Sequence, residues 1–130
     1  MNVSGSGVRV TGSVYITNVL EAAEKSFNIP HPTQEGKRLI YGVLEGPEHA
    51  VYVRGHITEN IIELPEEWVG LVDESTITVQ FTPIKKHQHL FVEDIRDNKI
   101  YVSSGLFESI NAYYLVQAMR KDVPKLITVR

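Results

Sequence analysis

The segment EGPEHAVYVRGH, residues 45–56, contains the densest group of side chains that could do chemistry. It carries two carboxylates, two imidazoles and a guanidinium, namely Glu45, Glu48, His49, Arg54 and His56. If these side chains converged, they could transfer protons or hold a metal ion.

The same segment is also typical of a turn that leads into a β-strand. Its Gly-Pro pair favours a turn, and the alternation that follows places the two valines on one face of a strand. Tyr52 and Arg54 then point to the opposite face, where Arg54 could pair with Glu45 or Glu48 across a hairpin. Gly55 indicates a bulge or a close approach of another group to the backbone. The segment alone leaves both interpretations open.

A second histidine pair could form half of a metal site. His87 and His89 are two positions apart, so on a strand they would face the same side. The remaining ligands would have to come from Glu48, His49 or His56, and a metal site needs its full ligand set. The alternative is a pair of solvated histidines at the start of a strand, beside a carboxylate. We therefore expect no metal site. The two histidines are instead candidate surface-binding residues, together with two residues of segment 45–56. The full candidate set is Tyr52, Arg54, His87 and His89.

Other catalytic patterns are missing from the sequence. There is no cysteine, no glycine-rich phosphate loop, and no serine within a Gly-x-Ser-x-Gly elbow. The acidic pairs at 66–67 and 73–74 flank Trp68 and are interpreted as solvated loop charges. We therefore predict a protein that is not an enzyme, with no catalytic residues and no cofactor.

Composition narrows the class of protein further. The 130 residues suffice for one domain with its own core, and 42% are hydrophobic. A net charge of −3 without a basic cluster argues against nucleic-acid binding. The first residues do not form a secretory signal, and no apolar run approaches the ~20 residues of a membrane helix. We expect a soluble chain that does not insert into membranes.

The elements that must position these side chains are predicted to be strands. Segment 75–83 alternates cleanly, with Ile77, Val79 and Phe81 pointing inward. A hairpin is predicted at Asp97–Asn98, and Trp68 is expected to plug one end of the core. Further strands are expected at 38–45, 49–57, 89–95, 99–104, 110–119 and 125–129, with 110–119 in a central position. The prediction for residues 38–130 is a mainly β head domain, an antiparallel β-sandwich or barrel.

The N-terminal part has a different pattern. Residues 1–18 divide into three hexads, the second and third of which alternate apolar and polar positions and end in small or polar residues. This short β arm is either a hairpin or a segment whose apolar residues contact other chains. The candidate trimer contacts are Val8, Val10, Val14 and Ile16. Residues 19–37 are interpreted as a connector that could begin with a short helix, which the prolines of IPHPT would end.

Several segments resemble a domain of tailed-phage virion proteins, found at the C-terminal ends of tail fibres of marine and cyanobacterial phages. The resemblance covers the chain from about Ser26 onward. Its most specific motifs are HPT, LEGPEHAVYVRG, LP..W..LVD, ITVQ.TPI and RKDVPKL. In longer relatives such a domain follows a repetitive β shaft, so the hexads resemble a shaft stub.

The resemblance implies a homotrimer and a location in the virion, which is assembled in the host cytoplasm. The implied function is a non-enzymatic surface projection, such as a short fibre, spike or knob. Other capsid or tail proteins would be its partners, and a host-surface glycan is a further candidate partner. Two alternatives stay open, a capsid decoration (cement) protein and a metal- or glycan-binding β domain.

Overall fold

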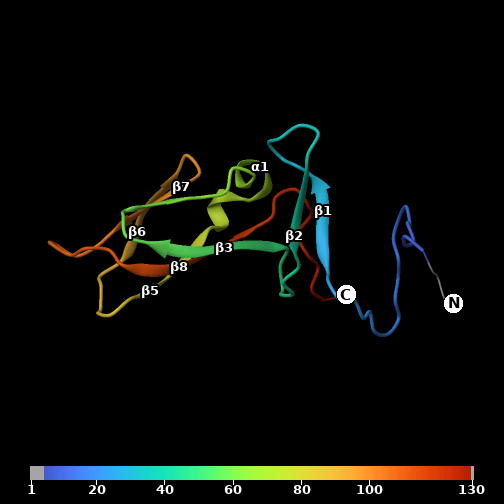
Figure 1. Cartoon of the computed structure of the whole chain (residues 1–130), viewed down its shortest axis with the longest axis horizontal. Coiled ribbons are helices and arrows are strands. Elements are labelled where there is room, and N and C mark those ends of the chain that lie inside the picture. The colour runs from blue at the N-terminus through green and yellow to red at the C-terminus, as the bar shows by residue number, and fades with distance from the viewer. Residues whose placement is uncertain (1–4, 130) are drawn as a thin grey trace.

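The computed structural model describes residues 5–129, which form three antiparallel sheets (Figure 1). A two-stranded ribbon pairs β1 (Ser26–Pro30) with β2 (Arg38–Gly42). One three-stranded sheet has the order β3-β8-β5, with β3 at Ala50–Ile57, β5 at Thr78–Pro83 and β8 at Ala112–Met119. The other has the order β4-β7-β6, with β4 at Ile61–Glu63, β6 at Phe91–Arg96 and β7 at Lys99–Ser103. The predicted mainly β, antiparallel fold is confirmed.

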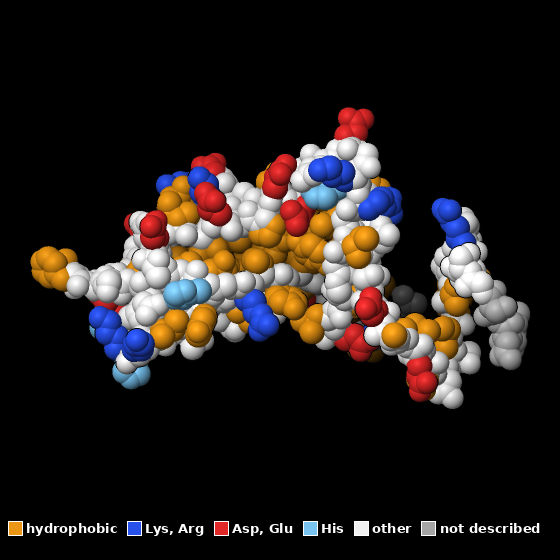
Figure 2. Space-filling view, viewed as in Figure 1, with side chains coloured by type: hydrophobic (Ala, Val, Ile, Leu, Met, Phe, Trp, Pro, Cys, Tyr) orange, Lys and Arg blue, Asp and Glu red, His pale blue; other side chains and the backbone are white. Residues whose placement is uncertain are grey.

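The core lies between the inner faces of the two three-stranded sheets. Val51 and Val116 contribute from one sheet, and Ile62, Ile100 and Val102 contribute from the other. Figure 2 shows a continuous band of hydrophobic side chains along the middle of the body. The predicted inward positions on β5 pack against the same cluster, as alternation requires. Within residues 5–129 no polar or charged residue is fully buried.

The connection from β4 to β5 closes one end of the core. It contains the short helix α1 (Trp68–Leu71) and a 3-10 turn, η1 (Glu74–Thr76). Trp68 is fully buried, as predicted, and its amide donates to the Pro65 carbonyl oxygen at 3.0 Å. Asp73 caps the 3-10 turn by accepting from the Ser75 amide at 3.0 Å. Asp73 is exposed, as predicted for a solvated loop charge, and the capping bond is an additional structural role.

Glu67 is the second carboxylate with a structural contact that the sequence did not reveal. Its Oε1 accepts a hydrogen bond of 2.6 Å from the Tyr41 hydroxyl, which ties the β1-β2 ribbon to α1. Burial raises the pKa of Tyr41 to about 12, with a further contribution from the bond to Glu67. The nearby Trp68 indole lowers the pKa of Tyr41. Its Nε1 atom nevertheless has no hydrogen-bond partner among the described residues. The two groups are therefore close, in a geometry that falls short of a hydrogen bond.

Two local predictions are confirmed by the turns and by the strand order. Asp97 and Asn98 have φ of 53° and 56° and join β6 to β7, the left-handed geometry that a two-residue hairpin requires. The Asn98 side-chain amide also donates to the carbonyl oxygens of Leu64 and Pro65, which fixes the neighbouring loop. Strand β8 is the central strand of its sheet, as expected for segment 110–119.

Three expected elements differ. The connector contains β1, and residues 18–27 are not helical, because an isolated helix of that length is marginal unless it packs on a core. Residues 125–129 form no strand, and the sheet that contains β8 ends at its edge strands β3 and β5. Residues 5–25 form neither a hairpin nor any other strand and extend away from the body (Figure 1). The first four residues of the predicted arm lie outside the described part of the chain. No helix among residues 5–129 is long and apolar enough to cross a membrane.

Candidate functional site

The outer face of the β3-β8-β5 sheet gathers the polar and aromatic side chains that alternate with the core residues. The strand register places eight of them, together with Leu115, in three rows, which we call the outer grid. The rows are Tyr52–Gln117–Thr78, Arg54–Leu115–Gln80 and His56–Tyr113–Thr82. All nine except Thr78 line a depression of about 910 Å³, to which Leu44 also contributes. The outer grid is therefore a concave surface that carries polar, charged and aromatic side chains.

Two tyrosines mark opposite ends of the outer grid. The side chain of Tyr52 is 47% exposed and that of Tyr113 is 57% exposed, so both rings are available to a ligand. His56 supports the second ring, because its imidazole lies 5.6 Å from the Tyr113 ring centroid. The Nε2 atom of His56 is 2.7 Å from the Asn111 Oδ1 atom, and this hydrogen bond fixes the imidazole.

Arg54 stands between the two tyrosines and has no hydrogen-bonding, ionic or aromatic partner among the described residues. The other arginines of the body are engaged. Arg96 pairs with a neighbouring aspartate and stacks on a tyrosine, Arg120 does the same with an aspartate and a phenylalanine, and Arg38 binds an asparagine. The predicted pairing of Arg54 with Glu45 or Glu48 is wrong, because Glu45 binds Lys25 and no contact joins Arg54 to Glu48 among the described residues. That hydrogen bond lowers the pKa of Glu45.

Gly55 allows a close approach, as its place in the sequence predicted. It lies opposite Tyr114 in the register, and a Cβ atom at position 55 would stand 2.6 Å from the Tyr114 hydroxyl oxygen. The tyrosine ring therefore occupies the inner face of β3 where a side chain is missing. The glycine keeps the two strands close directly beneath the outer grid.

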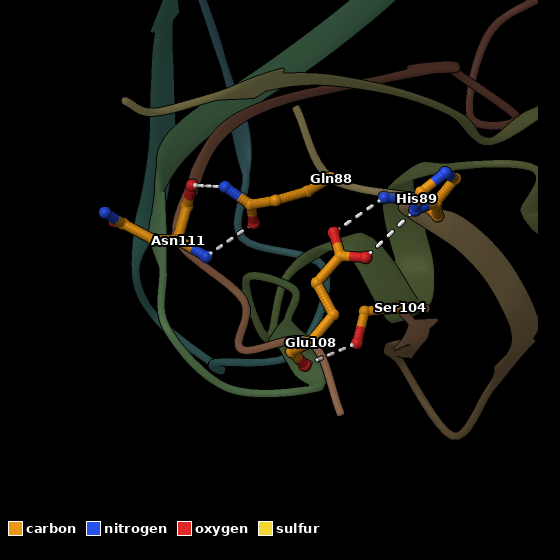
Figure 3. Close-up of polar contacts among 5 residues, drawn as sticks. All are labelled: Gln88, His89, Ser104, Glu108 and Asn111. Atoms are coloured by element: carbon orange, nitrogen blue, oxygen red, sulfur yellow. Dashed lines mark hydrogen bonds and ion pairs between the residues drawn. The ribbon is translucent and has the colours of Figure 1, made fainter. Parts of the chain in front are cut away.

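A second polar cluster joins the loop before β6 to the loop between β7 and β8 (Figure 3). The Glu108 carboxylate accepts from the His89 amide at 2.8 Å and lies 3.0 Å from the His89 Nδ1 atom. The hydrogen bond to the His89 side chain lowers the pKa of Glu108. Ser104 donates to the main-chain oxygen of Glu108 and not to the imidazole, so the cluster does not form a nucleophilic triad. Gln88 and the Asn111 main chain exchange two further hydrogen bonds.

This cluster holds the base of a loop with an apolar tip. The side chains of Leu106 and Phe107 are 87% and 99% exposed, and Phe107 has a φ of 57°, in the left-handed region that side chains disfavour. The tip projects from one end of the molecule in Figure 1, and hydrophobic atoms stand apart from the body there in Figure 2. Glu108 thus keeps an energetically unfavourable loop conformation in place.

The contact between Glu108 and His89 is expected to depend on pH. Because the pKa of Glu108 is lower in the folded protein than the usual ~4.3, the contact stabilises the loop above that pH. The stabilisation is lost as the pH falls through the lower, folded-state pKa. In an NMR titration, the His89 amide proton should shift with a midpoint below the usual value of glutamate. Glu108→Gln should abolish that transition, and a midpoint at or above the usual value would contradict the assignment.

The sequence-predicted candidates are brought together only in part. Tyr52 and Arg54 share the outer grid, whereas His87 and His89 lie in the loop before β6. That loop adjoins the end of the outer grid through Asn111, which binds both Gln88 and His56. Within the described residues no three His, Asp or Glu side chains are grouped so that they could hold a metal ion. Among these residues His87 and His89 are therefore not joined by Glu48, His49 or His56 in a ligand set.

The sequence did not indicate that His56, Tyr113 and the side-chain amides of the outer grid lie on one surface. Their signal was the alternation along β8, which is readable only once β3 and β5 are known to flank that strand. Comparison of the chain with protein-family models, with curated proteins and with solved structures found no match.

Proposed function

We propose that this chain is a non-enzymatic structural protein of a phage virion, which forms a trimeric projection through its N-terminal arm. The sequence resemblance from Ser26 onward supports the virion setting. The observation that carries the proposal is the segment 5–25, which contains the described part of the arm and the start of the connector and which we now call the arm. Six of its apolar side chains are between 48% and 68% exposed, namely Val8, Val10, Val14, Ile16, Val19 and Leu20.

The exposed apolar area of the arm favours assembly with other copies of the chain. Burying such area stabilises an assembly by roughly 25 cal/mol per Å². The arm has no sheet partner within its own chain, while the body already has a complete core without it. Copies of the same chain supply identical alternating stripes, so three arms wound together would bury what one arm leaves in water. Three joined heads would also bind a surface through several weak contacts at once.

The test compares the full chain with a variant that lacks residues 1–25. We expect light scattering to give a trimer for the full chain and a folded monomer for the variant, since the deletion stops before β1. Replacing Val8, Val10, Val14 and Ile16 together with serine should also give monomers. Replacing the exposed Val69 with serine is the matched control and should leave the trimer intact. A full-length monomer at micromolar concentration would overturn the proposal.

Labelling the protein on intact particles would then separate the two virion roles. Label on the tail is expected for a fibre, spike or knob, and label over the capsid would favour the decoration protein.

A further inference from the structure

We propose that the outer grid is a binding site for an anionic oligosaccharide, in which Arg54 binds an acidic group and the two tyrosines stack on sugar rings. The inference deepens the proposed function, because it gives the projection a class of surface ligand. It rests on that function for its biological setting alone. The chemistry is argued from the body of a single chain.

The charge of Arg54 is not satisfied within the described part of the chain. None of the nine positions of the outer grid carries a carboxylate, so the guanidinium has no local counter-ion. A guanidinium presents paired N–H donors that match a carboxylate or a sulfate in two parallel hydrogen bonds. Arg96, by contrast, is bound by Asp94 and stacked on Tyr101, so its charge is satisfied within the chain. The charge of Arg54 therefore favours an anionic ligand.

The order of side chains along the sheet sets the distance between the two tyrosine rings. Tyr52 lies opposite Gln117 and Tyr113 lies opposite His56, so four residues of strand separate the two rings. At 3.2–3.4 Å per residue the rings are about 13–14 Å apart along the strands, with Arg54 between them. One sugar cannot reach both rings, whereas an oligosaccharide can lie across the grid with its acidic group at the centre.

The polar side chains around the two tyrosine rings suit a sugar. Gln80, Gln117 and Thr82 can donate and accept hydrogen bonds, as the hydroxyl groups of a sugar do. Tyrosine rings bring apolar area and a hydroxyl together, which suits the mixed faces of a pyranose. A nucleic acid would need more positive charge than one arginine in a chain of net charge −3. An extended peptide would use the free backbone of an edge strand rather than this face.

The test is titration calorimetry of the full chain with oligogalacturonates, with sulfated dextran oligomers, and with neutral malto-oligosaccharides. We expect binding of one or both acidic ligands and much weaker binding of the neutral one. The better acidic ligand identifies carboxylate or sulfate as the group recognised. Arg54→Gln should weaken binding about 10- to 100-fold, as expected for loss of a hydrogen bond to a charged group. Tyr52→Ala and Tyr113→Ala should each weaken it as well.

The matched controls are Arg96→Gln and Tyr101→Ala, which remove the same residue types from the other sheet and should leave the affinity unchanged. Circular dichroism of each variant reports whether it is folded. The inference is overturned if neither acidic ligand binds at millimolar concentration or if the neutral ligand binds equally well. It is also overturned if folded Arg54→Gln keeps the full affinity, or if single-stranded DNA binds in place of the saccharides. A monomer that binds the acidic ligand would refute only the trimer, and a trimer that does not bind would refute only this inference.

Discussion

Replacing Trp68 with alanine is expected to lower the free energy of unfolding by about 3–5 kcal/mol, the usual cost of removing a buried large aromatic side chain. Trp68 is fully buried at the end of the sandwich, where it packs in the same cluster as Leu71 and Ile100. The helix that carries it has only four residues and cannot move inward to fill the cavity without breaking its bonds to the Pro65 loop. Chemical denaturation monitored by circular dichroism measures the loss.

Two variants separate packing from the polar chemistry of the indole. Trp68→Phe keeps most of the apolar volume and removes the Nε1–H group, which has no partner within the described residues. It should therefore cost clearly less than the alanine variant. Val69→Ala changes an exposed neighbour and should stay within about 0.5 kcal/mol of the unmodified protein. An equal loss for the alanine variants at 68 and 69 would show that Trp68 does not support the core.

Replacing Gly55 with valine should destabilise the protein by about 1–3 kcal/mol, the typical cost of overpacking a well-filled interior. The added Cβ would lie 2.6 Å from the Tyr114 hydroxyl oxygen and 2.9 Å from its Cζ atom, closer than such atoms can approach. The ring would have to leave the inner face of β3, where it packs against the core. Denaturation midpoints measured as above report the change.

A double-mutant cycle identifies the cause of that loss. Tyr114→Ala removes the ring and costs packing energy by itself, but it leaves room for a side chain at position 55. The double variant should therefore be more stable than the sum of the two single losses predicts. Strict additivity would place the cause of the Gly55 effect elsewhere. Gly42→Val is the control, because no heavy atom lies within 4 Å of a Cβ placed there.

Features that depend on nearby residues could be predicted from the sequence. Alternation in segment 75–83 places Val79 and Phe81 against the core, since strand geometry alone sets that direction. The turn at Asp97–Asn98 needs only two residues that tolerate positive φ. Gly55 also behaved as expected, although nothing in the sequence indicated that Tyr114 would be its neighbour.

Features that depend on distant residues could not be predicted. Glu108 meets His89 across 19 positions, and Tyr41 meets Glu67 across 26. Strand β1 was missed because its pattern is short and lies between charged residues and prolines, so only pairing with β2 reveals it. The outer grid joins three strands that are far apart in the chain, and the sequence alone could not show that their outward-facing side chains form one surface. Arg54 was assigned to the wrong partner for the same reason.

The way the arm joins the body determines how the protein would respond to a pulling force. The arm enters at Ser26, which pairs with Gly42 at the open end of the β1-β2 ribbon, and the chain leaves for the body from that same end. Tension between arm and body would therefore separate the ribbon one residue pair at a time, beginning beside the contact of Lys25 with Glu45. The next element along the chain, β3, is paired with β8 along eight residues and would be loaded only after the ribbon had opened. The ribbon would thus yield first and act as an extensible joint, while the outer grid kept its shape.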